Sequence, residues 1–118
     1  MAKAKDKLYL IKPGFTDANR DDGPFVCPFC NQIEGLLASF PELAANIEVE
    51  RVDFPRPRAA VIAAVGEANQ GLPLLVFGDA PAEDAKRHGE TAYLQDTNGI
   101  LTWLAERHGF PKPHKFLG

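Results

Sequence analysis

The stretch Cys27-Pro28-Phe29-Cys30 lies between a segment with strand-like alternation and a segment with helical periodicity. Leu8 to Ile11, upstream, is typical of a β-strand. Downstream, apolar residues recur at helical spacing, at Ile33, Leu36, Leu37 and Phe40. Pro28 would be the first helical residue, where its missing N–H costs no hydrogen bond. The chain's two cysteines are therefore predicted at a strand–loop–helix junction, with the helix starting at Cys27.

A dithiol at the start of a helix is suited to reversible thiol chemistry. The free N–H groups of a first helical turn favour a negative charge, and thiols in Cys-X-X-Cys motifs ionise more readily than free cysteine. Cys30 lies one turn after Cys27, so we expect Cys27 to be the nucleophile and Cys30 the resolving thiol. Two alternatives stay open, which are an unreactive pair of thiols and half of a zinc site that lacks a second ligand pair.

The rest of the chain alternates between strand and helix patterns. Further strands are predicted at 47–54, after Pro73 within 72–77, and at 91–95, and further helices at 58–68 and from Asp96–Thr97 to Gly109. The segments 13–26 and 78–89 read as polar loops. The order β-α-β-α-β-β-α predicts one α/β domain over 1–118, with its core at about 7–109, a tail at 110–118 and helices on both faces of a four-stranded mixed sheet. The first two strands should be parallel and the last two antiparallel.

Composition excludes several classes of protein. The chain has 118 residues, 45% of them hydrophobic, and a formal net charge of −3, which disfavours a nucleic-acid partner. No apolar run approaches the roughly 18 residues of a membrane span, and the first residues show no signal-peptide pattern. We expect a cytoplasmic protein without a tightly bound cofactor. In a reducing compartment, a cysteine pair this close is more often catalytic, redox-sensing or metal-binding than structural. The oligomeric state is left open.

Three pieces of the sequence resemble the glutaredoxin/thioredoxin superfamily. Cys27-Pro28-Phe29-Cys30 is similar to the Cys-Pro-aromatic-Cys motif of glutaredoxins. Gly71 to Leu74, followed by an apolar strand, is similar to the loop that carries a cis-proline beside the cysteines. Asp96-Thr97, entering the last helix, is similar to the acidic-hydroxyl step that binds the γ-glutamyl end of glutathione in glutathione transferases. The resemblance implies a thioredoxin-like fold.

A closer resemblance is to a family of bacterial proteins of unknown function with a predicted thioredoxin-like fold. It is carried by the four segments Pro13-Gly14-Phe15, Cys27 to Leu37, Phe40 to Leu43 and Val52 to Arg58, and it covers most of the chain. This match supports the fold and adds no known activity.

The superfamily resemblance implies roles for individual residues. Cys27 would attack, Cys30 would resolve and Pro73 would be cis. The Leu72 backbone would pair with a bound peptide or with glutathione. Asp96 and Thr97 would receive the amino-acid end of glutathione, and Lys12 would face its glycyl carboxylate. The implied function is a thiol–disulfide oxidoreductase with glutathione or a protein disulfide as partner. The alternatives are a binding module without turnover and a redox sensor.

Several other residues are candidates for a site or for packing. Arg56 and Arg58 flank Pro57, and such a pair either holds a carboxylate or phosphate or is simply solvated. Asp96 and Thr97 are also suited to capping the last helix. Trp103 is predicted to pack within that helix, and His108 to have a structural role in its last turn, where the helix dipole favours positive charge.

Overall fold

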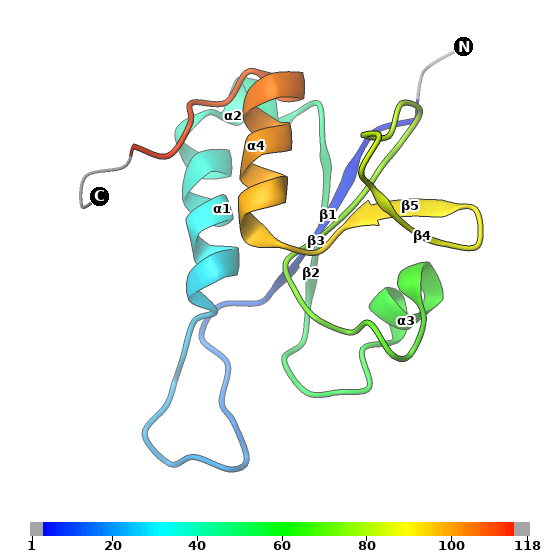
Figure 1. Cartoon of the computed structure of the whole chain (residues 1–118). Coiled ribbons are helices and arrows are strands. Elements are labelled where there is room, and N and C mark those ends of the chain that lie inside the picture. The colour runs from blue at the N-terminus through cyan, green and yellow to red at the C-terminus, as the bar shows by residue number, and fades with distance from the viewer. Residues whose placement is uncertain (1–3, 115–118) are drawn as a thin grey trace.

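The computed structural model describes residues 4–114, which form an α/β fold with a mixed five-stranded sheet in the order β2-β1-β3-β5-β4 (Figure 1). The strands are β1 (Lys7–Ile11), β2 (Glu48–Val52), β3 (Leu74–Val76), β4 (Lys86–His88) and β5 (Thr91–Leu94). The helices are α1 (Pro28–Ser39), α2 (Pro41–Ala44), α3 (Ala59–Val65) and α4 (Thr97–His108). No helix in this part of the chain is long and apolar enough to cross a membrane.

The strand pairing confirms the two predicted relationships. β1 and β2 pair in parallel, with Lys7 opposite Glu48, and α1 lies between them in the sequence. β3 and β5 are antiparallel neighbours. β1 also pairs with β3, antiparallel, as far as Tyr9 opposite Leu74. Four of the five residues of β1 are buried, because this strand has a neighbour on each side and helices over both faces.

The predicted four-stranded sheet is wrong in its strand count. Lys86–His88, within the segment expected to be a loop, forms β4 at the edge of the sheet and pairs antiparallel with β5. All three of its side chains are exposed, so it shows no apolar alternation. A sequence signal did exist, because Gly89 (φ 59°) and Glu90 are the two residues that separate the paired positions His88 and Thr91.

Helices cover both faces of the sheet, as predicted. Figure 1 shows α1 and α4 on one side and α3 on the other. The larger apolar cluster lies under α1 and α4 and contains Leu8, Leu10, Ile33, Leu37, Leu75, Ile100, Leu101 and Leu104. The smaller one lies under α3 and contains Tyr9, Val52, Val61, Val65, Leu74 and Tyr93. β1 therefore supplies residues to both cores.

The limits of the core differ slightly from those predicted. Phe110 is buried and its ring contacts Phe40 edge-on, so it belongs to the core and not to a tail. Of the predicted tail, 115–118 lies outside the described residues. Gly109 ends α4 in the left-handed conformation, at φ 78°, as expected for a C-terminal glycine cap.

A buried carboxylate lies at the start of β1. Asp6 Oδ1 accepts the N–H of Gly78 at 2.8 Å, and Oδ2 accepts the indole N–H of Trp103 at 2.8 Å. Nε2 of His108 lies 2.7 Å from the same Oδ2. Burial by itself raises the pKa of Asp6, but the hydrogen bonds from Gly78, His108 and Trp103 outweigh it and hold that pKa below its usual value. Trp103 and His108 thus have the packing and structural roles predicted for them.

Candidate functional site

Cys27 is the N-cap residue of α1. Its backbone is extended (φ −75°, ψ 115°), and Pro28 occupies the first turn, as the sequence predicted. The Sγ atom of Cys27 accepts the backbone N–H of Cys30 at 3.2 Å. A sulfur in this position uses one of the N–H groups that a helix start leaves unpaired. The side chain is half-buried, and its neighbours Val26 and Phe29 are exposed by 48% and 57%, which gives the thiol a solvent-accessible apolar rim.

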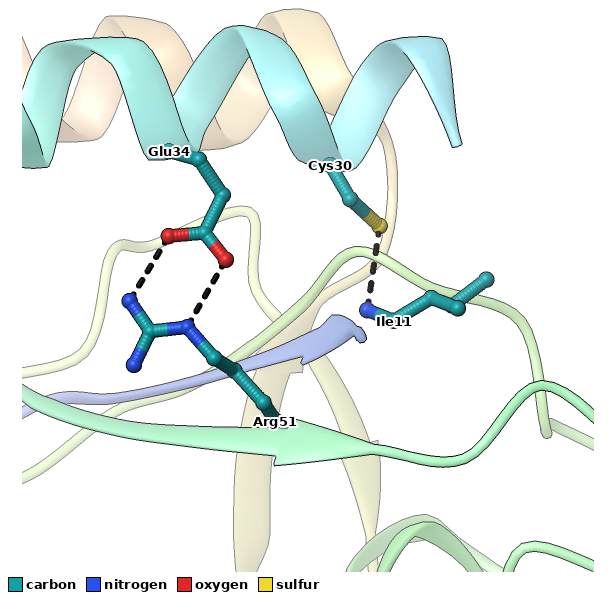
Figure 2. Close-up of polar contacts among 4 residues, drawn as sticks. All are labelled: Ile11, Cys30, Glu34 and Arg51. Atoms are coloured by element: carbon teal, nitrogen blue, oxygen red, sulfur yellow. Dashed lines mark hydrogen bonds and ion pairs between the residues drawn. The ribbon is translucent and has the colours of Figure 1, made fainter. Parts of the chain in front are cut away.

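Cys30 is enclosed, in contrast to Cys27. Its exposed fraction is 1%, and its Sγ accepts the backbone N–H of Ile11 at 3.5 Å (Figure 2). Burial raises the pKa of the Cys30 thiol to about 12, opposed in part by the Ile11 N–H. Cys30 is therefore held as a protonated thiol behind Cys27. The two sulfurs differ in exposure and in partners.

The N–H of Ile11 is available to Cys30 because the β1–β3 ladder stops short of it. Lys12 donates its N–H to Val52 of β2, and successive N–H groups of a strand point to opposite neighbours. The N–H of Ile11 therefore points toward the β3 side. Since the last β1–β3 pair is Tyr9 with Leu74, no β3 residue in that ladder receives it. The sulfur of Cys30 takes the place of the missing carbonyl.

A second polar contact fixes α1 over the sheet. Arg51 of β2 donates Nε and Nη2 to the two carboxylate oxygens of Glu34, at 2.8 and 2.7 Å. Figure 2 shows Glu34 and Cys30 pointing from α1 toward the strands beneath it. A bidentate arginine–carboxylate pair sets orientation as well as distance. Together the two contacts hold α1 over β1 and β2.

Arg58 is a buried cation near this dithiol. It precedes α3, and its exposed fraction is 6%. Its Nε and Nη2 atoms both donate to the carbonyl of Phe54, at 3.0 and 2.6 Å, and Nη1 donates to the carbonyl of Gln70 at 2.8 Å. Gln70 Oε1 accepts the backbone N–H of Arg58 at 2.8 Å. The positive charge of Arg58 lowers the pKa of Cys30, although burial outweighs it.

Arg56 and Arg58 do not act as a pair. Arg56 is exposed, whereas Arg58 points inward to the two carbonyls, so neither of the roles weighed from the sequence describes both residues. Sequence reasoning missed the inward position of Arg58, because its acceptors on Phe54 and Gln70 belong to two loops that meet only in the fold.

The segment before β3 carries the predicted cis-proline. The Leu72–Pro73 peptide bond is cis, as are Gly23–Pro24 and Arg56–Pro57. Pro73 is buried, and Leu72 packs against both apolar clusters. Gln95 ties the segment to the end of β5, because its Nε2 donates to the carbonyls of Asn69 and Gly71 at 2.7 and 3.1 Å.

The remaining predicted site residues have structural partners. Asp96 caps α4, accepting the N–H of Gly99 on Oδ2 at 2.7 Å, and Thr97 is the first residue of that helix. Lys12 lies at the end of β1, with its Nζ 2.9 Å from Asp53 Oδ1. Of the predicted site residues, the structure joins Cys27 and Cys30 by a direct contact, whereas the contacts of Lys12 and Asp96 are with Asp53 and Gly99.

The long segment between β1 and α1 is closed at its base. Phe15 and Phe25 exchange backbone hydrogen bonds, with the Phe25 N–H donating to the Phe15 carbonyl at 2.8 Å. The Phe15 ring stacks on Phe54, with ring centres 4.2 Å apart and planes 5° apart. Phe54 is the residue whose carbonyl binds Arg58, so this loop is anchored beside the guanidinium.

The fold and this dithiol define the chain as an α/β protein with a helix-capping Cys-X-X-Cys pair. A family model matches residues 5–112, and the chain belongs to that family, which is described as a protein of unknown function (DUF3088). No curated protein and no solved structure matched the chain. Within residues 4–114, no cluster of three or more His, Cys, Asp and Glu side chains could hold a metal ion.

Proposed function

We propose that this protein is a thiol–disulfide oxidoreductase of glutaredoxin type, with a thioredoxin-like fold and the Cys27–Cys30 pair as its redox centre. The observation that carries the proposal is the asymmetry of the two sulfurs. Cys27 caps α1 at a half-buried position with its Sγ on a helix N–H, and Cys30 is enclosed behind it. An accessible thiolate in front of a protected thiol is the arrangement that a two-step exchange requires.

The proposed reaction is a disulfide reduction by two thiols. The Cys27 thiolate attacks one sulfur of a substrate disulfide, which forms a mixed disulfide and releases the other substrate sulfur as a thiolate. Cys30 then gives up its proton to that leaving group or to solvent and attacks Cys27 Sγ. This step releases the second substrate sulfur and forms the Cys27–Cys30 disulfide. The substrate gains two electrons and the protein loses two, which a low-molecular-weight thiol such as glutathione restores as it becomes its own disulfide.

The fold supports the same proposal. The order of elements, the parallel β1–β2 pair joined through α1, and a cis-proline ahead of β3 all agree with the superfamily resemblance. The additional edge strand β4 extends the expected pattern without interrupting it. In this proposal Leu72 offers its backbone to the substrate, and Lys12, Asp96 and Thr97 contact glutathione. The proposed setting is the cytosol, where such pairs are kept reduced between cycles.

The test is an equilibrium titration of the pair in glutathione redox buffers, read as free thiols after acid quenching. A potential near the roughly −200 to −230 mV of glutaredoxins is expected. The Cys30→Ser variant should accumulate a mixed disulfide at Cys27, and Cys27→Ser should form none. If the wild-type thiols stay reduced across the whole buffer range, the protein is not an oxidoreductase. Binding of glutathione by both serine variants would then favour the binding module.

A further inference from the structure

Arg58 is a buried cation without an anionic partner. Its three guanidinium hydrogen bonds all end on main-chain carbonyls. Among the described residues no carboxylate lies within ion-pair distance of it, whereas the exposed or half-exposed Lys12, Arg20 and Arg51 each have one. An isolated buried charge is costly. A cation retained at such a position points to a negative charge that forms beside it.

The groups that can supply this negative charge are the two thiols. Burial, and then the charge on Arg56, lower the pKa of Arg58, while Cys30 and Cys27 raise it. Arg56 is itself a cation. Among the charged and titratable neighbours of Arg58, the thiols of Cys27 and Cys30 are therefore the groups that can become negative. Of the two, Cys30 is enclosed and held protonated by its burial. Cys27, half-buried at the start of α1, is the more accessible of the two sulfurs.

The backbone fixes the guanidinium at the dithiol end of the sheet. Arg58 joins the segment that follows β2, through Phe54, to the segment that precedes β3, through Gln70. β2 and β3 are the two neighbours of β1, whose last residue, Ile11, donates to Cys30. The Phe54 ring, 5.5 Å from the guanidinium carbon, and the Phe15 ring stacked on it cover this region. The charge is therefore held in place and away from water.

We propose that Arg58 is the internal counter-charge of the Cys27 thiolate, and that it acts as a positioning residue that sets the reactivity and redox poise of the Cys27–Cys30 pair. This inference rests on the proposed function, because it concerns the same dithiol. A fixed cation favours the thiolate over the neutral thiol. It thereby stabilises the reduced pair and raises the reduction potential, since an oxidised pair carries no charge for it to pair with.

Other charges near the dithiol are already paired or exposed. On α1 itself the titratable groups are Cys30 and Glu34, and Glu34 is paired with Arg51 of β2. From the segment after β2 come Arg58 and the exposed Arg56. Lys12, at the end of β1, is paired with Asp53, and Arg20, in the loop before α1, is paired with Asp22. The segment before β3 presents Leu72 and Pro73, which carry no charge. Among these charged groups near the dithiol, Arg58 is thus the buried one that has no ion-pair partner.

The test measures the rate of Cys27 alkylation by iodoacetamide against pH, in a Cys30→Ser background that leaves one thiol. Arg58→Met replaces the guanidinium with an uncharged side chain of similar length. In this variant we expect the midpoint of the pH profile to rise by about one pH unit, and alkylation at pH values below the midpoint to be about tenfold slower. Arg58→Lys keeps the charge and should retain most of the wild-type profile. The matched control, Arg56→Gln, removes one exposed charge from the same segment and should shift the midpoint by less than half as much.

Two outcomes would overturn the inference. One is an equal shift in Arg58→Met and Arg56→Gln, and the other is a loss of low-pH reactivity in Arg58→Lys as large as in Arg58→Met. Near-UV circular dichroism shows whether each variant is folded, and if Arg58→Met unfolds, Arg58→Gln replaces it as the uncharged variant in both comparisons. Arg58→Met should also move the equilibrium with glutathione toward the disulfide about tenfold, or about 30 mV. The alkylation profile needs no disulfide, so it stays informative if the proposed turnover fails.

Discussion

A buried charge lies near each end of β1, and the two charges have different kinds of partner. At the start of the strand, the Asp6 carboxylate receives Gly78 and Trp103 N–H groups and a contact from His108, each at 2.7–2.8 Å. At its end, roughly 16 Å away along the strand, the Arg58 guanidinium is bound by carbonyls and lacks a carboxylate among the described residues.

Under the proposal, this difference separates a charge that stabilises the fold from a charge that acts on the dithiol. The donors around Asp6 hold the pKa of its carboxyl below the usual value, so the anion is permanent near neutral pH and ties β1 to α4. In the proposal above, the charge of Arg58 is the counter-charge of the Cys27 thiolate. A buried charge whose hydrogen bonds are all made stabilises the fold. A buried charge without an ion-pair partner can instead stabilise the charged form of a neighbouring reactive group.

The largest expected effect is at the dithiol end. Cys27→Ser should reduce the rate of disulfide reduction to the uncatalysed background, because the attacking thiolate is lost. The free energy of unfolding should change by no more than about 0.5 kcal/mol, since serine is also a good N-cap. Cys27→Ala is the control and should cost about 1 kcal/mol, because it removes the cap. Disulfide reduction that persists in Cys27→Ser would show that the dithiol end of β1 is not the reactive one.

The next effect is at the opposite end. Asp6→Ala should lower the free energy of unfolding by about 3 kcal/mol, because it leaves the N–H groups of Gly78 and Trp103 without their acceptor. Urea denaturation measures this change, and the alkylation profile of Cys27 should stay the same. The exposed Asp79→Ala is a matched control, expected within about 0.5 kcal/mol of the wild type. A loss below 1 kcal/mol in Asp6→Ala would show that the network is not structural.

Acid should reduce the contribution of the Asp6 carboxylate to the free energy of unfolding. The folded-state pKa of Asp6 lies below the 3.8 of an unperturbed aspartate, so the carboxylate adds stability that is present above pH 3.8 and is lost as pH falls through the lower, folded-state pKa. Unfolding free energies between pH 6 and pH 3 should therefore fall less steeply in Asp6→Asn than in the wild type. Equal slopes in the two proteins would contradict this assignment.

The smallest effect belongs to the ion pair that holds α1 over β2. Glu34→Gln should cost about 0.5–1 kcal/mol, because the Arg51 side chain is 47% exposed and solvent screens the pair. Denaturant unfolding measures it, with the exposed Glu90→Gln as the control. We expect the Cys27 profile to be unchanged, because Cys30 keeps its bond to Ile11. A shifted profile would mean that the pair also positions the dithiol.

Local patterns predicted most of the elements near the site. Pro28 and the apolar spacing after it placed the start of α1, and Cys27 is its N-cap. Asp96 was expected to cap α4 and does so. The strand predicted within 47–54 is present as β2, at one edge of the sheet and in regular register with β1. These predictions succeeded because capping and periodicity depend on residues within a few positions of each other.

β4 could not be found in the same way. Lys86, Arg87 and His88 are exposed and polar, so no buried face distinguishes them from a loop. They form a strand because β5 offers an open edge to pair with. The pairing partner, and not the intrinsic preference of the three residues, determines their conformation.

Local patterns in the chain predicted the dithiol, its place at the start of a helix, and an α/β fold with helices on both faces of the sheet. The enclosure of Cys30 with Ile11 as its donor, and the inward direction of Arg58 while Arg56 is exposed, became visible in the folded chain alone. The two kinds of feature differ in where their interaction partners lie in the sequence. A cap is made by neighbours in the chain, whereas burial and charge compensation are made by segments that come together when the chain folds.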